Sequence, residues 1–131
     1  MIRSLTKTLT PEFTDSELHY IRDLLRKHFH KEVEIQIADC DLVLEPGTGE
    51  TVPCPAVLWH EENTNFVAFK VGMFRFRAQF FYTPHEQHAT DNEEYTGLHE
   101  CVTAVLDARS DHQREHHHND SDESGKSGQL A

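Results

Sequence analysis

The stretch FVAFKVGMFRFRAQFFY, residues 66–82, decides the fold of this chain. It is rich in aromatic and β-branched residues, which predicts two strands, 66–71 and 73–82, separated by Gly72. The two segments either form a tight hairpin or make one long strand with a bulge at the glycine. A hairpin with the loop Gly72–Met73 would place Lys70 opposite Arg75, which is unfavourable, so both arrangements stay open.

Side chains alternate between two faces along the second half of this stretch. Arg75, Arg77 and Gln79 share one face of the predicted strand. The other face carries Phe74, Phe76, Ala78, Phe80 and Tyr82. We therefore expect these apolar side chains to face a core, and the two arginines to form a separate basic stripe on the outside.

Amphipathic segments flank the strands on both sides. Thr14 and Glu17 have capping-box spacing, and apolar residues then recur at helical spacing as far as Phe29, which predicts a helix over 14–29. Asp91 and Glu94 repeat the cap-like spacing ahead of a second predicted helix. The apolar face of that helix consists of Tyr95, Leu98, Val102, Val105 and Leu106.

The region between the first helix and residue 66 carries weaker strand signals. Alternation over 33–37 predicts a strand with one wet face, which Asp39 and Asp41 interrupt. The chain is then expected to turn over 45–50, to extend past the prolines of 53–55, to form a short strand over 56–60 and to loop over 61–65.

This order of elements predicts an α+β two-layer sandwich, in which an antiparallel sheet of about four strands is flanked by an N-terminal and a C-terminal helix. Residues 1–109 form this single domain. After Arg109 no apolar periodicity remains. Residues 110–131 are rich in histidine, acidic residues and serine, so we expect a disordered tail.

Composition excludes several classes of partner. The net charge is −11, and 18 of the 23 acidic residues lie within 1–109, so the excess belongs to the domain. Such a field repels phosphate backbones and anionic lipid, which argues against nucleic-acid or membrane binding. Three scattered cysteines without a CxxC motif indicate a reducing compartment, so we expect a cytoplasmic protein. A chain this small buries its surface only marginally, which favours a homodimer.

The cysteines also give little support to catalysis. Cys40 lies between Asp39 and Asp41, whose charges raise a thiol pKa and weaken the nucleophile. Cys54 stands between two prolines, and Cys101 lies near the apolar stripe of the second helix. No glycine-rich phosphate loop and no hydrolase nucleophile motif is present. We therefore expect a protein that is not an enzyme.

The first functional hypothesis is a cytosolic adaptor, assembly or regulatory protein that acts by binding a protein partner. Trp59 and Phe81 are the candidates for exposed anchors, and Arg75 and Arg77 would supply charge at the rim. The two arginines have a second interpretation, because they can equally pair with neighbouring glutamates of the same chain.

The second functional hypothesis is metal delivery or sensing, because the chain contains eleven histidines. His85 and His88 form an HxxH pattern in the loop before the second helix and can present two imidazoles to zinc or nickel. Further candidate ligands are His60, His99 and Cys101. No complete four-ligand spacing is visible, and the first hypothesis, without a cofactor, is preferred.

Overall fold

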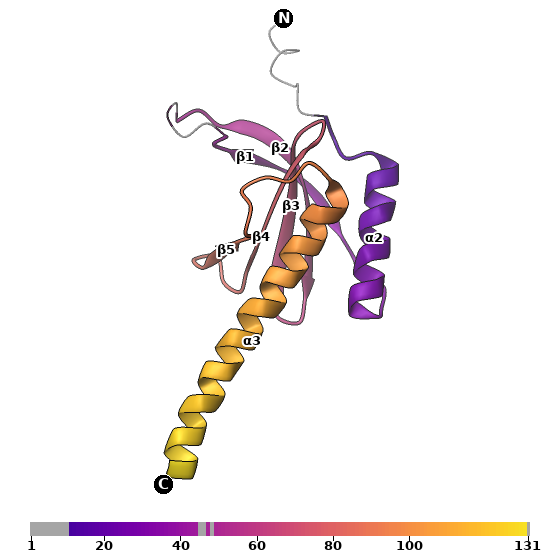
Figure 1. Ribbon diagram of the computed structural model, residues 1–131. Helices are drawn as coiled ribbons and strands as arrows, with labels where there is room; N and C mark the ends of the chain where they lie inside the picture. The colour runs from indigo at the N-terminus through magenta and orange to yellow at the C-terminus, as the bar shows by residue number, and fades with distance from the viewer. Residues whose placement is uncertain (1–10, 45–46, 48, 131) are drawn as a thin grey trace, which may run out of the picture.

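The protein is an α+β sandwich with one antiparallel sheet. The computed structural model describes residues 11–44, 47 and 49–130, and of residues 116–130 it describes the backbone alone. The elements are α2 (Asp15–Phe29), β1 (Gln36–Leu42), β2 (Val52–Glu61), β3 (Thr64–Gly72), β4 (Arg75–Phe81), β5 (Gln87–Ala89) and α3 (Leu98–Leu130). The sheet has the order β1-β2-β3-β4-β5 (Figure 1). The predicted fold class is confirmed, with five strands in place of about four.

The first helix forms where capping chemistry predicts it. The Thr14 hydroxyl accepts a hydrogen bond from the Glu17 N–H at 3.1 Å, and the Glu17 carboxylate accepts one from the Thr14 N–H at 2.8 Å. The helix ends at His30, whose left-handed backbone lets its N–H donate to the Arg26 carbonyl. The helix predicted over 14–29 is therefore confirmed.

Both helices pack on the same face of the sheet, around Phe66 in β3. The Phe66 ring stacks on Trp59 with centroids 5.3 Å apart, and it also meets Phe29 of α2 and Phe80 of β4. Ile21 and Leu25 of α2 and Val102 and Val105 of α3 complete this core. The predicted inward orientation of Phe76, Ala78 and Phe80 is confirmed.

A two-residue turn joins β2 and β3, so the loop expected over 61–65 is shorter than predicted. Glu62 and Asn63 have φ of 53° and 61°, the left-handed pair of a type I′ hairpin turn. Buried Arg109 stabilises this geometry, because its guanidinium donates to the Glu62 carbonyl at 2.9 Å and to the Glu62 carboxylate at 2.8 Å. Its Nε donates to the Thr64 hydroxyl at 3.0 Å.

The β3–β4 connection is a hairpin with an irregular register. Lys70 pairs with Phe76, and Gly72 pairs with Arg75, so the two cations are not directly opposite each other. Phe74 lies in the turn and is 71% exposed. The expectation that Phe74 faces the core is wrong, because the turn takes it out of the strand's alternation.

Lys70 is buried on the helix side of β3 and fastens α2 to the sheet. Its ammonium donates to the Glu17 carboxylate at 2.7 Å and to the Glu12 carbonyl at 3.1 Å. The same Glu17 oxygen accepts the Thr14 N–H. The capping box is thus also the partner of a buried charge, which would be costly to leave unpaired.

The first strand begins later than alternation predicts. β1 runs through Asp39 and Asp41, which were expected to interrupt it, and Val33 packs into the core ahead of the strand. Ile37 is 58% exposed. Among the described strands β1 pairs with β2 alone, and Ile37 belongs to neither of the two apolar clusters. In the register of β1 and β2, Pro53 lies opposite Asp41 and Pro55 lies opposite Asp39. Pairing of β2 with β3 starts only at Ala56, after both prolines.

The second helix also begins later than predicted, at Leu98. Tyr95 instead pairs with Phe76 through two backbone hydrogen bonds of 2.8 Å. The Glu94 carboxylate binds Arg75 and Arg77, so it is not available as the partner of an Asp91 cap. The capping-box interpretation of Asp91 and Glu94 is therefore wrong.

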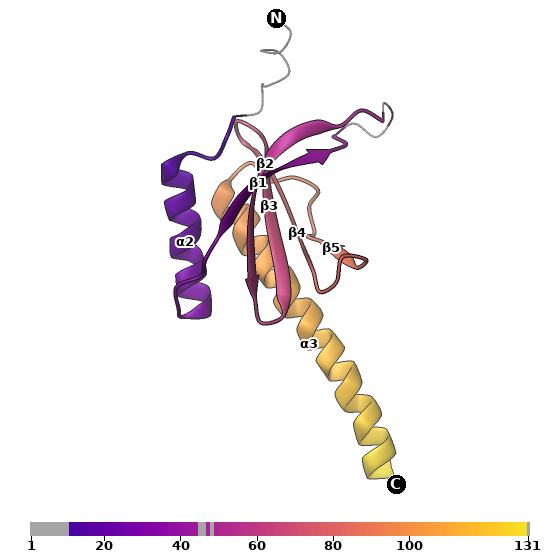
Figure 2. The same cartoon turned by 180° about the vertical axis from the view of Figure 1, so that it is seen from behind.

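The face of the sheet away from the helices carries a second apolar cluster. Its buried members are Cys54, Ala56, Val67, Phe69 and Val71. Figure 2 shows this side with the strands towards the viewer and α3 behind them. Leu42 and Val43 line a cavity of about 210 Å³ together with Gln79 and Ala89, so the sheet curls until the end of β1 approaches β5.

The structure continues α3 to Leu130, through the segment expected to be a disordered tail. The boundary at residue 109 and the disorder of 110–131 stay predictions. Residues 45, 46 and 48 lie outside the described part of the chain, and most of the turn predicted over 45–50 lies there with them. Among the described residues, no helix combines the length and apolar character needed to span a bilayer.

We expect Phe66→Ala to lower the free energy of unfolding by about 3–5 kcal/mol, because it removes a ring that is 1% exposed from the centre of the core. Phe74→Ala is the matched control, since the same atoms are removed from a ring in the solvent-exposed turn. Chemical denaturation of both variants measures the difference. Equal losses would contradict this account of the core.

Candidate functional site

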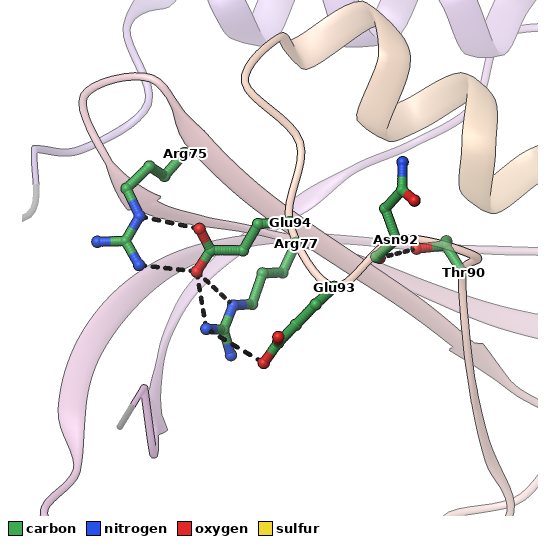
Figure 3. A network of polar contacts seen from close by, with 6 residues as sticks. All are labelled: Arg75, Arg77, Thr90, Asn92, Glu93 and Glu94. Atoms are coloured by element: carbon green, nitrogen blue, oxygen red, sulfur yellow. Dashed lines mark hydrogen bonds and ion pairs between the residues drawn. The ribbon is translucent and has the colours of Figure 1, made fainter. Parts of the chain in front are cut away.

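Two arginines of β4 hold one glutamate on the outer face of the sheet (Figure 3). Arg75 donates Nε to one oxygen of Glu94 at 2.9 Å and its Nη2 to the other at 2.7 Å. Arg77 donates two hydrogen bonds to that second oxygen, at 3.0 and 2.7 Å. Glu93 lies 3.8 Å from Arg77.

The arginines change the acidity of Glu94. Hydrogen bonds from Arg75 lower the pKa of this carboxyl, desolvation opposes them, and hydrogen bonds from Arg77 add to the decrease. The result is a pKa of about 2, against an ordinary value of 4.5. The network holds the segment before α3 against β4, which is the second interpretation that the sequence left open for these arginines. Their role at the rim of a partner site stays a prediction.

The two predicted anchors lie on opposite faces of the sheet. Trp59 is 3% exposed and packs under the helices, so the expectation that it is exposed is wrong. Trp59 lies opposite Phe66 in the register of β2 and β3, so its side chain points into the same core. Phe81 is half-buried against the second apolar cluster. The structure does not bring these two side chains together as one anchor.

The strand β1 presents an exposed edge of the sheet, as the charges of Asp39 and Asp41 suggest from the sequence. It pairs with β2 at every position from Gln36 to Leu42, and no other described strand pairs with it. Ile37, Asp39 and Asp41 lie on one face of β1 and are all exposed. Cys40 and Leu42 point the other way, towards the second apolar cluster.

The candidate metal ligands are dispersed over the fold. His85 is exposed in the turn before β5, and His88 lies within β5. His60 bonds Asn65 at 2.9 Å and His99 bonds Tyr20 at 2.7 Å, while Cys101 is buried in the core. Among the described residues, no three His, Cys, Asp or Glu side chains are grouped so that they could hold a metal ion.

His88 instead contacts His112, which the sequence analysis did not single out. The two ring centroids are 4.3 Å apart, and Phe80 and Tyr82 pack around the pair. His112 lies three residues beyond the predicted end of the domain at Arg109. Its position in register with the apolar face of α3, seven residues after Val105, was the signal that could have found it.

None of the three thiols has the environment of a nucleophile. Burial raises the pKa of Cys101 to about 12. Desolvation also raises the pKa of Cys54, and it raises that of Cys40 together with the charges of Asp39 and Asp41. A reactive cysteine requires the opposite shift, so thiol chemistry is not favoured at any of these positions.

Neither the protein-family models, nor the curated proteins, nor the solved structures contain a match to this chain.

We expect Glu94→Gln to be destabilising by about 1–2 kcal/mol at neutral pH, a value reduced from the full pKa shift because Arg75 is half-exposed and solvent screens the pair. A depressed folded pKa contributes stability above the ordinary pKa of 4.5, and this contribution is lost as the pH falls towards about 2. The difference between wild type and variant in denaturation experiments should shrink over that range. Glu93→Gln is the control and should change little; a pH-independent loss in Glu94→Gln would contradict the assignment.

We expect thiol labelling of the native chain near neutral pH to be slow and confined to Cys40, the one cysteine that is not fully buried. In concentrated urea all three cysteines should react, because burial no longer suppresses their thiolates. Mass spectrometry of the labelled peptides provides the measurement. Rapid native labelling of Cys54 or Cys101 would show that its burial or its raised pKa is wrong.

Proposed function

We propose that this chain is a non-enzymatic adaptor or regulatory protein that binds an extended, basic segment of a partner protein along the edge of β1. The supporting observation is the seven-residue edge Gln36–Leu42, whose residues are largely exposed. The opposite edge, β5, has three residues and offers much less backbone for pairing.

An edge strand carries backbone N–H and C=O groups that can extend the sheet by one more strand. On β1 the side chain of Ile37 adds an apolar contact, since more than half of it is in solvent. A partner segment paired antiparallel or parallel to β1 would gain main-chain hydrogen bonds, and alternate side chains would meet Ile37 on the same face. Affinity would thus come from the backbone, and selectivity from this face of the strand.

Charge selects the chemistry of the partner. Asp39 and Asp41 are exposed on the face that carries Ile37, and no ion pair joins either of them to another described residue. A strand with lysine or arginine opposite these positions would be attracted, and the net charge of −11 would speed its approach. Self-pairing of two β1 edges around Cys40 would set Asp39 against Asp41, so a second copy of this chain fits the edge poorly.

The thiol chemistry supports the non-enzymatic part of the proposal, since each cysteine pKa is raised. The acidic edge supports the expectation that nucleic acid is not the partner. Arg75 and Arg77 fit this proposal as structural residues, because Glu94 engages both of them.

The test uses synthetic decapeptides that alternate lysine with valine, and matched peptides that alternate glutamate with valine. The lysine peptide should bind and should protect the amides of Gln36–Leu42 from hydrogen exchange, because they become paired. Asp39→Lys with Asp41→Lys should weaken binding by about tenfold or more, which corresponds to about 1.4 kcal/mol. Fluorescence anisotropy and exchange measured by mass spectrometry report the two effects.

Two controls separate strand pairing from general attraction. Glu86→Lys with Asp107→Lys changes the net charge equally at exposed positions away from β1 and should leave most of the affinity. A lysine peptide with proline at alternate positions lacks the required N–H donors and should bind poorly. Equal weakening by both pairs of substitutions, or equal binding of the proline peptide, would refute the proposal.

A further inference from the structure

Two cysteines face each other across the first pair of strands. Cys40 of β1 lies directly opposite Cys54 of β2 in the antiparallel register. Side chains at opposed positions of such a pair point to the same face of the sheet. Both cysteines accordingly belong to the second apolar cluster, Cys54 as a buried member and Cys40 as a half-buried residue packed against it. The register therefore places two free thiols side by side.

The spacing of opposed strand positions is compatible with a disulfide. Directly opposed residues of an antiparallel pair have Cα atoms about 4.5–5.5 Å apart, within the range of about 4.4–6.8 Å that a disulfide spans. The backbone can thus stay in place, and the Cβ atoms need to approach each other by only about 1 Å. Burial raises the pKa of Cys54, Arg77 opposes this effect, and repulsion from the Cys40 thiolate adds to the increase, as expected of neighbouring sulfurs.

The third cysteine is kept away from this pair. Cys101 is buried in the other core, which lies between the sheet and the helices. The sheet therefore separates its thiol from the second apolar cluster, where Cys40 and Cys54 meet. An intramolecular bridge has one pair of partners in the native fold.

The position of this pair matters because β1 is weakly held. Among the described strands it pairs with β2 alone, and most of its residues are exposed. Cys40 and Leu42 are its members in the second apolar cluster, and both are only partly buried. A bond between Cys40 and Cys54 would add a covalent link where packing contributes little.

We propose that Cys40 and Cys54 form a redox-sensitive pair, which reacts with a low-molecular-weight disulfide such as glutathione disulfide and fastens β1 to β2. The more exposed Cys40 thiolate attacks one sulfur of the small disulfide, whose S–S bond breaks, and one small thiol leaves. The Cys54 thiolate then attacks the Cys40 sulfur of this mixed disulfide and releases the second small thiol. The two protein thiols lose two electrons and two protons, and the small disulfide is reduced to two thiols.

The raised pKa of both thiols affects the rate of this exchange more than its outcome. Burial is the main cause at each cysteine, and Asp39 and Asp41 add to it at Cys40. Few thiolates exist near neutral pH, so the first step is slow. A dithiol whose thiolates are not stabilised does not resist oxidation. The pair is thus suited to a slow response to oxidising conditions and not to catalysis, and it does not depend on the proposed partner segment.

The test exposes the full native chain to glutathione disulfide, alkylates the remaining thiols after denaturation and maps the peptides by mass spectrometry. The expected product has lost two hydrogen atoms, carries a Cys40–Cys54 bridge and is alkylated at Cys101 alone. Cys101→Ala is the matched control and should form the same bridge, whereas Cys54→Ala should stop at the mixed disulfide on Cys40. A bridge that includes Cys101, chains joined through Cys40, or a mixed disulfide that persists in the wild type would overturn the proposal.

A second measurement reports whether the bridge fastens β1. The midpoint of thermal unfolding should rise by about 5–10 °C in the oxidised wild type, because the link restricts the unfolded chain. The same treatment should leave the midpoint of Cys40→Ser unchanged, since this variant cannot form the bridge. Hydrogen exchange of the Gln36–Leu42 amides should slow in the bridged form. An unchanged or lowered midpoint in the bridged chain would overturn the proposal, because the native register would then not accommodate the bond.

Discussion

The structure depends on the burial of β3 on both of its faces. Phe66, Ala68 and Lys70 point towards the helices, and the residues between them point into the second apolar cluster. A shift of one residue in its pairing would exchange these two sets and place Lys70 among apolar side chains. The register of β3 with β2 and β4 thus determines which face each helix covers, and where the two edges of the sheet lie.

Charged side chains at the margins of this core join segments that are far apart in the sequence. Lys70 connects β3 to the N-terminus of α2 through Glu17, and Arg109 connects α3 to the β2–β3 turn through Glu62. Arg75 and Arg77 connect β4 to the segment before α3 through Glu94. A charge that is buried with its partner also specifies geometry, because removing either partner leaves the other without compensation.

The two edges of the sheet differ in length and in chemistry. β1 offers a long acidic backbone edge with one exposed aliphatic side chain, which suits an extended basic segment. β5 is too short for that purpose, but it brings His88 against His112. The pair forms only because α3 continues past Arg109 and crosses β4, which Figure 1 shows in front of the strands.

The sequence by itself determined the elements whose signals are local. The capping box of Thr14 and Glu17, the alternation through Phe76 and Phe80, and the antiparallel α+β order all follow from neighbouring residues. The raised pKa of the Cys40 thiol could also be predicted, since Asp39 and Asp41 adjoin this residue in the chain.

Only the tertiary structure decided the contacts between distant residues. Glu94 caps no helix, because arginines seventeen and nineteen residues away bind its carboxylate. Trp59 is buried because it faces Phe66 across the sheet, and the exposure of Ile37 follows from the position of β1 at the edge. The meeting of His88 with His112 has the same origin: local patterns specify which face of an element is apolar, but pairing and packing specify which residues meet there.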